Sequence, residues 1–457
     1  MKSRAAAAAR LRRQLAWVPN DRVAWHNLAA AEGDLGRAVE AEAAARRAIA
    51  LGITAPETYL VLARALQAQR RLDDAEREFE VVLRQRPAYT DAHRDYAQLV
   101  WMRTGHAELA LRRLDATLSA APSDVGLHLI RSIVLEFAGD PAAALAAAEQ
   151  GLTFAPGDAP LLRQAAHLCA QTGQAARALG LAQEASKSST DPGAQITLCE
   201  ALLAVGQLDA ADAIISALRA SLPLNQNVIA LQATAWRLNG DARYAELYDY
   251  GALVTAQSLE PPPGWTNLDG FLADIAAELD GLHSFVAHPF QQSVRGGGQL
   301  ALQEHDLARP LIRALFTSIH SAVHRHLANV GAGADPMRSL NTGRGVFTGA
   351  WSVRLASGGS HVDHMHPRGW LSSACYIALP PTIGSGTNTD SGGPPNRAGW
   401  LRFGQPGIPT APALGADYFV KPEPGLLALF PAYMWHGVEP FVSDRPRLAV
   451  AFDVAPA

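Results

Sequence analysis

The sequence has few cysteines, no excess of basic charge and no long apolar run. Its 457 residues include 3 cysteines, an odd number without metal-ligand spacing, which excludes a disulfide framework and points to a reducing, cytoplasmic setting. The 39 basic and 43 acidic residues are interspersed and give a net charge of -4, so we expect no nucleic acid partner. No stretch is long enough to span a bilayer, and no membrane partner is expected.

The beginning of the chain is rich in alanine and arginine over residues 1–17. This composition is similar to that of a transit peptide, but the continuous apolar region of a secretory signal is missing. The segment equally predicts a first capping helix. The whole chain is longer than one hydrophobic core normally organises, so we expect two domains.

A repeated alanine runs through the N-terminal half at intervals of 33–35 residues: Ala41, Ala75, Ala110, Ala144, Ala178, Ala211 and Ala245. A glycine stands five residues ahead of most of them, and Arg70 takes its place once. A period of about 34 residues, with small residues at a turn and at a helix crossing, is typical of tetratricopeptide repeats. An irregular alanine-rich bundle would not keep so constant a period. We therefore predict an α-helical tetratricopeptide solenoid of about seven repeats over residues 1–255.

The second domain is expected over residues 256–457. The solenoid should end after a helix over residues 244–250, because the prolines of residues 261–264 cannot continue a helix. Amphipathic patterns predict two helices, over residues 268–282 and 307–327. The glycine run of residues 296–298 has no Lys-Ser/Thr after it and follows no predicted strand, so it is not a nucleotide loop; a flexible loop is favoured over a functional one.

Short strands dominate the rest of the chain. They are predicted over residues 351–355, 374–379, 399–403, 425–430 and 448–454. Many short strands at such spacing indicate a jelly roll or barrel-like double sheet. The polar run of residues 383–396 predicts a mobile loop near the mouth of this domain.

Histidines concentrate in residues 361–367 and recur at His436. Two imidazoles two residues apart on a strand project from one face, and a later strand can supply a third ligand. Three protein ligands with open positions suit a non-haem Fe(II) oxygenase. Strand alternation places His361 and Asp363 on one face and His364 and His366 on the other, so either pair remains a candidate.

An arginine that could bind a carboxylate group lies on the last predicted strand. Arg447 lies eleven residues after His436, and its guanidinium can hold a carboxylate through two hydrogen bonds. Arg445 and Arg354 are rivals for this role, and Arg447 could instead pair with Asp444 or Glu439. Tyr376, on the strand after the histidines, is either a hydroxyl donor to a cosubstrate or a core aromatic.

These motifs resemble those of bacterial tetratricopeptide-repeat proteins with a C-terminal 2-oxoglutarate/Fe(II)-dependent oxygenase domain. The resemblance covers essentially the whole chain and is carried by residues 288–293, 351–355, 364–373 and 430–436. It implies a double-stranded β-helix with Fe(II) held by His364, His366 and His436, and with Arg447 on the distal carboxylate of 2-oxoglutarate. The usual carboxylate ligand would then be an imidazole, unless Asp363 reaches the metal through a bulge.

The sequence thus favours a 2-oxoglutarate- and Fe(II)-dependent dioxygenase that hydroxylates a protein or peptide side chain recruited by the tetratricopeptide groove. A small-molecule hydroxylase is the second hypothesis. A non-catalytic interaction scaffold with a degenerate β-domain is an alternative of another class. A zinc hydrolase with the same three histidines is a further one, for which no nearby glutamate is placed as a general base.

Overall fold

The computed structural model of the chain describes residues 2–189, 191–383 and 396–457. Contacts between residues divide it into two compact units, one of Met1–Phe154 with Gln303–Asp306 and one of Ala155–Leu302 with Leu307–Ala457. The domain boundary near residue 255 stays a prediction; helices give way to strands at that point of the chain. The loop expected over residues 383–396 lies, apart from its two ends, outside the described residues.

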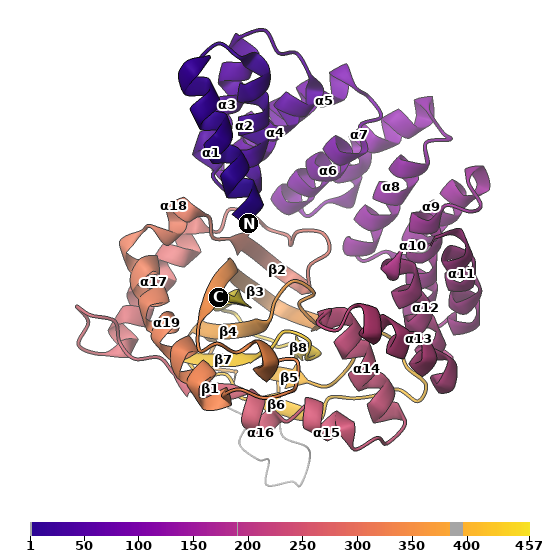
Figure 1. Ribbon diagram of the computed structural model, residues 1–457, viewed down its shortest axis with the longest axis vertical. Coiled ribbons are helices and arrows are strands. Elements are labelled where there is room, and N and C mark those ends of the chain that lie inside the picture. Colours follow the sequence, from indigo (N-terminus) through magenta and orange to yellow (C-terminus); the bar gives the residue numbers. More distant parts are fainter. Residues whose placement is uncertain (1, 190, 384–395) are drawn as a thin grey trace. The chain divides into compact units, whose positions relative to one another are not determined.

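The helical part consists of consecutive helices that pack in pairs (Figure 1). After α1 (Lys2–Trp17), the paired helices are α2 (Arg22–Asp34) and α3 (Ala38–Ala50), α4 (Pro56–Ala68) and α5 (Leu72–Gln85), α6 (Thr90–Thr104) and α7 (Ala107–Ala120), α8 (Val125–Phe137) and α9 (Pro141–Phe154), α10 (Ala159–Gln171) and α11 (Ala175–Ser188), and α12 (Pro192–Ala204) and α13 (Leu208–Ser221). This confirms the predicted helical repeat region. Among the described residues, no helix combines the length and the apolar character that crossing a membrane requires.

The repeated alanines and glycines have the positions that the period predicts. Six of the alanines are completely buried at helix crossings: Ala41, Ala75, Ala110, Ala144, Ala178 and Ala211. The residues at the turns all have positive φ: Gly36, Arg70, Gly105, Gly139, Gly173, Gly206 and Gly240. Glycine adopts this conformation without a Cβ penalty, which explains its recurrence. Arg70 adopts it at φ 60° and forms an ion pair of 2.7 Å with the buried Asp306.

The seventh repeat departs from the expectation. Its first helix, α14 (Gln226–Leu238), is followed by two short helices, α15 (Arg243–Leu247) and α16 (Tyr250–Leu253). The single helix predicted over residues 244–250 is therefore wrong. Asp249 interrupts it, because its carboxylate accepts a hydrogen bond from the Ala252 amide and caps α16. Ala245 consequently lies exposed instead of at a helix crossing.

The C-terminal part is an antiparallel sheet with the order β1-β7-β4-β9-β3-β8-β5-β6, and β2 pairs with β3. Its strands are β1 (Thr255–Ser258), β2 (Val294–Ala301), β3 (Gly345–His364), β4 (Leu371–Ala378), β5 (Leu401–Phe403), β6 (Tyr418–Val420), β7 (Leu426–Pro431), β8 (His436–Val438) and β9 (Arg447–Pro456). The long strand β3 pairs with β9 through its first part and with β8 through its last residues. It therefore belongs to two four-stranded arrays, β7-β4-β9-β3 and β3-β8-β5-β6, which confirms the jelly-roll prediction.

Helices flank this sheet. They are α17 (Leu268–Leu282), α18 (Glu304–Leu307), α19 (Pro310–Val330) and the 3₁₀ helix η1 (Arg338–Leu340). The bounds of α17 agree with the sequence, whereas α19 begins at Pro310, a residue suited to the first turn of a helix. Phe271 and Ile275 of α17 and Ile319 of α19 are buried in one apolar core with residues of the sheet.

The glycine run is a strand, so the predicted flexible loop is wrong. Strand β2 pairs antiparallel with β3, with a register shift between Arg295 and Gly297. Gly296 has φ +64°, and a Cβ on Gly297 would overlap the carbonyl oxygen of Arg354. Glycine is needed here because the two backbones approach closely. The strand was hidden in the sequence because glycine carries no strand preference.

Candidate metal centre

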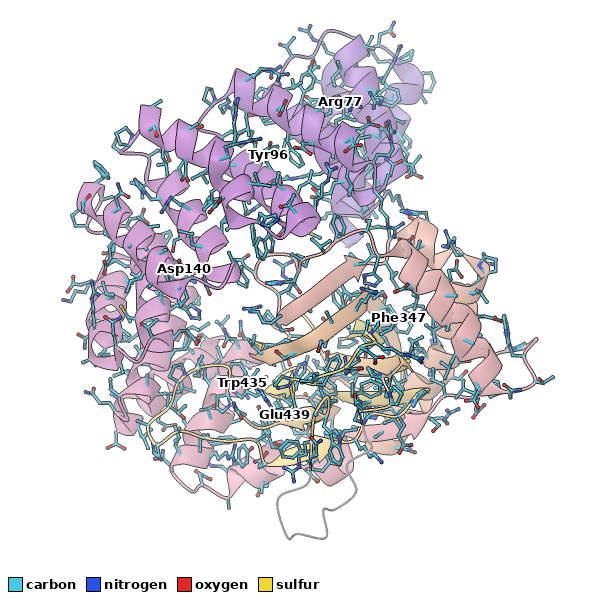
Figure 2. The ribbon with its side chains drawn as sticks, turned by 180° about the vertical axis from the view of Figure 1, so that it is seen from behind. Arg77, Tyr96, Asp140, Phe347, Trp435 and Glu439 are labelled. Atoms are coloured by element: carbon cyan, nitrogen blue, oxygen red, sulfur yellow. The ribbon has the colours of Figure 1, made fainter. Side chains whose placement is uncertain are left out.

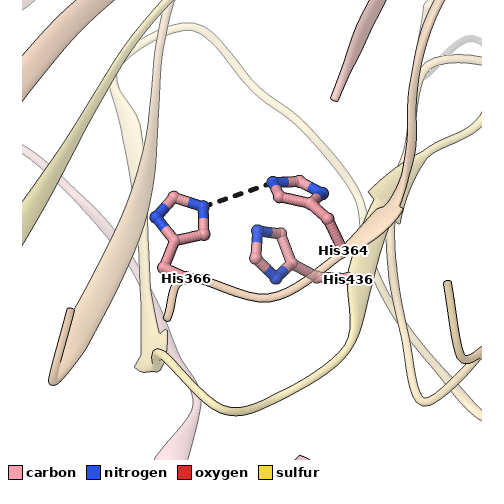
Figure 3. Close-up of side chains that lie close together, drawn as sticks. All are labelled: His364, His366 and His436. Atoms are coloured by element: carbon pink, nitrogen blue, oxygen red, sulfur yellow. Dashed lines mark hydrogen bonds between the residues drawn. The ribbon is translucent and has the colours of Figure 1, made fainter. Parts of the chain in front are cut away.

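Three histidines converge where two strands of the sheet end. His364 is the last residue of β3, and it pairs directly with His436, the first residue of β8. His366 follows two residues after the end of β3. One imidazole nitrogen of each residue lies within 4.8 Å of the others, a group able to hold a metal ion (Figure 3). We expected both His364 and His366 on a strand, but only His364 is on one.

The spacing of the three rings suits a single ion. The Nε2 atoms of His364 and His366 are 3.2 Å apart (Figure 3). Nitrogens about 2.1 Å from one ion, at angles of about 90–110°, are separated by roughly 3.0–3.4 Å. The ring centroid of His436 lies 4.2 Å from that of His364 and 5.1 Å from that of His366.

The hydrogen bonds of the three rings select the tautomer that a metal requires. The Nδ1 atoms of His364 and His436 lie 2.9 Å from the carbonyl oxygens of Val362 and Met434. The Nδ1 atom of His366 lies 2.6 Å from a carboxylate oxygen of Asp453. Because all three partners accept hydrogen bonds, we assign the proton to Nδ1 in each ring. Each Nε2 then keeps its lone pair for an ion.

Asp453 is a site residue that the sequence reasoning did not identify. It lies on β9, is only 7% exposed, and accepts a further hydrogen bond of 3.1 Å from the Ser372 hydroxyl. The same hydroxyl lies 3.2 Å from Nδ1 of His366. The available signal was an acidic residue within an otherwise apolar strand, where an unpaired charge would be costly.

Burial keeps the rings of His364 and His436 neutral. Burial and, after it, the neighbouring His366 lower the pKa of His364 to about 3. Burial also lowers the pKa of His436 well below its ordinary value, with His364 and His366 contributing. The ring of Phe430 packs against His436 at 4.6 Å between centroids and forms an apolar wall. Neutral rings are the form that binds metal, so protons compete weakly at neutral pH.

Asp363 points away from the three histidines. Both of its carboxylate oxygens accept hydrogen bonds of 2.8 Å from Arg402, which also pairs with Glu439 at 3.0 Å. Glu439 and Trp435, the residues that flank β8, are labelled in Figure 2. Asp363 is thus fully engaged in an ion pair and is not part of the histidine group.

His361 lies beside the histidine group, against our expectation from strand alternation. Between His361 and His364, three steps along β3 match two steps along β8, which is a bulge. The bulge turns both rings to one side, where they stack at 6.0 Å and 19°. Nδ1 of His361 lies 2.9 Å from the Ser293 hydroxyl on the residue before β2. Burial lowers the pKa of His361, followed by the effects of His364 and Arg447.

Arg447 is buried beside Tyr376. It is 1% exposed, and its guanidinium carbon lies 5.0 Å from the centroid of the Tyr376 ring. Burial lowers the pKa of Arg447, and the nearby Tyr376 opposes this shift. Within the described residues, Nε of Arg447 and the Tyr376 hydroxyl have no hydrogen-bond partner. Both buried groups would be satisfied by an anionic ligand.

The rival arginines are turned outward. Arg354 pairs with Asp280 at 2.7 Å, and Arg445 is exposed. The proposed surface pair of Arg447 with Glu439 is also wrong, because Glu439 pairs with Arg402 and Arg447 is buried. Of the three arginines, Arg447 alone has its charge inside the sheet domain.

A comparison with known protein families agrees with this arrangement. Residues 349–453 match the family described as "Putative 2OG-Fe(II) oxygenase". A search of curated protein sequences found no match. Among solved structures, PilF of Pseudomonas aeruginosa is similar with 16% identity, 46% of this chain and 96% of that chain covered, and a TM-score of 0.35.

Two further solved structures are similar over the helical part. A tetratricopeptide-repeat protein of Parabacteroides merdae has 16% identity, with 50% of this chain and 90% of that chain covered and a TM-score of 0.37. Yeast Tom70 has 13% identity, with 55% of each chain covered and a TM-score of 0.44. The repeat period and the buried alanines indicate a helical region of tetratricopeptide type, and the match to the 2OG-Fe(II) oxygenase family covers residues 349–453 of the C-terminal part.

Proposed function

We propose that the C-terminal domain is a 2-oxoglutarate- and Fe(II)-dependent oxygenase in which His364, His366 and His436 hold the iron. The supporting observation is the convergence of three imidazoles whose Nδ1 atoms are all engaged elsewhere. When bound, Fe(II) with dioxygen and 2-oxoglutarate supplies the oxidation: the cosubstrate becomes succinate and CO₂, and one oxygen atom enters a C–H bond of the substrate.

The charge of the site favours an anionic cosubstrate. Three histidine ligands bring no negative charge to a divalent ion, and the buried guanidinium of Arg447 adds a positive charge. 2-Oxoglutarate carries a carboxylate at each end. We propose that Arg447 holds the carboxylate far from the iron, with the Tyr376 hydroxyl as a second donor, because both groups are buried and, in the described part of the chain, Nε of Arg447 and the Tyr376 hydroxyl lack a hydrogen-bond partner.

His361 lies beside the three histidines, and the charge of Arg447 affects its ring. Its ring stacks on His364, its pKa responds to the charge of Arg447, and its Nδ1 is held by Ser293. We propose that His361 positions 2-oxoglutarate and is not an iron ligand. Phe430, packed on His436, contributes by keeping water from the metal on that side.

The substrate is proposed to be a protein or peptide side chain recruited by the helical repeats. The support is architectural, because a row of helix pairs offers a long surface on which an extended chain gains many weak contacts. The small-molecule hydroxylase remains the alternative. It becomes preferred if the repeats prove dispensable for turnover of the substrate.

Anaerobic Fe(II) titration followed by succinate measurement in air tests the oxygenase. The wild-type protein should bind one Fe(II) and convert 2-oxoglutarate slowly without substrate. His436→Ala should lose both properties, whereas Asp363→Asn should keep Fe(II) binding because its carboxylate faces Arg402. Fe(II) binding without any succinate formation, with and without candidate peptides, would favour the non-catalytic scaffold.

Recruitment by the repeats is tested by removing residues 1–154. These residues form the first compact unit together with residues 303–306, which remain in the shortened protein. For a peptide substrate found by screening, kcat/KM should fall, while the slow conversion of 2-oxoglutarate without substrate should stay the same. An undiminished kcat/KM would support the small-molecule reading.

A further inference from the structure

The chain between β5 and β6 runs along the first helices of the last three repeats. The contacts lie at equivalent repeat positions, because Ala170, Leu203 and Arg237 each stand eight residues before the repeated alanine. Ala170 lines a cavity with Ile408 and Pro409. The carbonyl oxygen of Leu203 accepts a hydrogen bond of 3.0 Å from the Ala411 amide. Contacts that recur with the repeat period are those of an extended ligand on a solenoid surface.

Arg237 holds both ends of this segment. Its Nη1 donates hydrogen bonds of 2.9 Å to the carbonyl oxygens of Gly404 and Gly415, and its Nη2 lies 3.5 Å from Asp417. A second row of equivalent positions adds to the contact. His167 and Glu200 line the same cavity as Ile408, and Thr234 accepts a hydrogen bond of 3.0 Å from the indole of Trp435.

The segment itself has the composition of a groove-binding peptide. Residues 404–417 contain neither helix nor strand, and no charged residue occurs before Asp417. Pro406, Pro409 and Pro412 lie three residues apart, a spacing that suits an extended chain with little entropy to lose on binding. Ile408 packs against an apolar cluster that includes Cys199 and Leu202 of α12.

The same segment is joined to the metal centre at its beginning. Phe403, the last residue of β5, pairs directly with His436. The Gly404 amide donates a hydrogen bond of 3.0 Å to the carbonyl oxygen of Trp435, the residue before His436. Trp435 is labelled in Figure 2, and its indole is the group that reaches Thr234. The strand that carries His436 is therefore held between β3 on one side and β5 on the other, and β5 leads directly into the segment that Arg237 and Leu203 hold.

We infer that the inner faces of α10, α12 and α14 form a peptide-binding site whose ligand is the chain's own segment 404–417, and that this binding positions His436. The occupant of the site is an extended, uncharged, proline-rich chain. An external polypeptide of that kind engages these three repeats only by displacing the internal segment. This inference holds whether or not the metal centre is an oxygenase, because it concerns the packing of the segment.

A peptide added in trans tests the inference. In the full-length protein, residues 405–416 are replaced by a Gly-Ser linker of equal length, and a fluorescent peptide of residues 404–417 is titrated. The linker variant should bind this peptide, and the wild-type protein should not, because its site is filled. Adding Arg237→Ala to the linker variant should weaken binding at least tenfold. Arg112→Ala, an exposed arginine on α7, is the matched control and should have no effect.

The metal provides a second readout. The linker variant should bind Co(II) more weakly than the wild type, and the added peptide should restore the affinity. If the linker variant keeps wild-type helicity but does not bind the peptide, or if the wild type binds it equally well, the internal ligand is refuted. Unchanged Co(II) affinity in the linker variant would refute the positioning of His436.

If the linker variant does not fold, hydrogen exchange on the full chain with the single change Arg237→Ala decides the question. The Ala411 amide donates a hydrogen bond to Leu203 in the wild type. Its exchange rate should rise at least tenfold in Arg237→Ala and should equal the wild-type rate in Arg112→Ala. Equal protection of this amide in all three proteins would contradict the inference.

Discussion

Replacing Asp453 should weaken metal binding without removing a metal ligand. Asp453 is 7% exposed and lies 2.6 Å from Nδ1 of His366, so the two groups share a short, buried hydrogen bond. Removing a residue that orients a ligating histidine typically lowers metal affinity about 10–100-fold, which corresponds to about 1.4–2.8 kcal/mol. The effect on affinity should exceed that on global stability, because the carboxylate acts on one ring.

Two variants order the effect within that range. Asp453→Asn keeps an oxygen acceptor but loses the charge, so we expect a decrease of about tenfold. Asp453→Ala leaves Nδ1 of His366 with only the Ser372 hydroxyl at 3.2 Å, so the decrease should approach about 100-fold. Competition between the protein and a chelator for Fe(II) or Co(II), under anaerobic conditions, measures both affinities.

Asp363→Asn is the control for this prediction. It breaks a bidentate ion pair with Arg402 and should lower the unfolding temperature, but metal affinity should remain that of the wild type. The opposite result, a loss of metal binding in Asp363→Asn with none in Asp453→Ala, would refute the reasoning. It would assign the metal to a carboxylate at position 363 in place of His366.

Three other predictions follow from single side chains. Arg447→Ala should strongly raise the 2-oxoglutarate concentration needed for half-maximal turnover and leave Fe(II) binding nearly intact. Arg445→Ala changes an exposed residue and should alter neither quantity. Equal cosubstrate affinity in Arg447→Ala would remove its proposed role. Ala144→Trp should overpack a completely buried helix crossing and lower the free energy of unfolding by about 1–3 kcal/mol, whereas Ala245→Trp on the exposed equivalent position should be nearly neutral in denaturant titrations. Burial lowers the pKa of His326 from 6.5 to about 4, so the imidazole takes up a proton in the unfolded chain before it does in the folded chain as the pH falls below 6.5. Between pH 6.5 and pH 4, the free energy of unfolding of the wild type should therefore fall by up to about 3 kcal/mol relative to that of His326→Asn. A difference between the two proteins that does not depend on pH would contradict this.

The sequence by itself determined the helical repeats, because their signals are local. A buried alanine at each helix crossing and a positive φ at each turn constrain residue type at fixed spacing, whatever the rest of the chain does. The same holds for α17 and for most strands of the sheet, whose apolar patterns are complete within a few residues. The seventh repeat deviates because Asp249 caps a new helix, and the alanine period contains no signal for this cap.

Only the tertiary structure decided which polar groups face the metal centre. Alternation along a regular strand separated His361 from His364, but a bulge against β8 turned both inward. The partner of Asp363 is Arg402, and that of His366 is Asp453, 87 positions later in the chain. Such pairings depend on strand register and on long-range hydrogen bonds, which residue type and local spacing do not encode. The contacts of segment 404–417 could not be predicted for the same reason. The groups that bind this segment come from three separate helices and meet only in the folded chain.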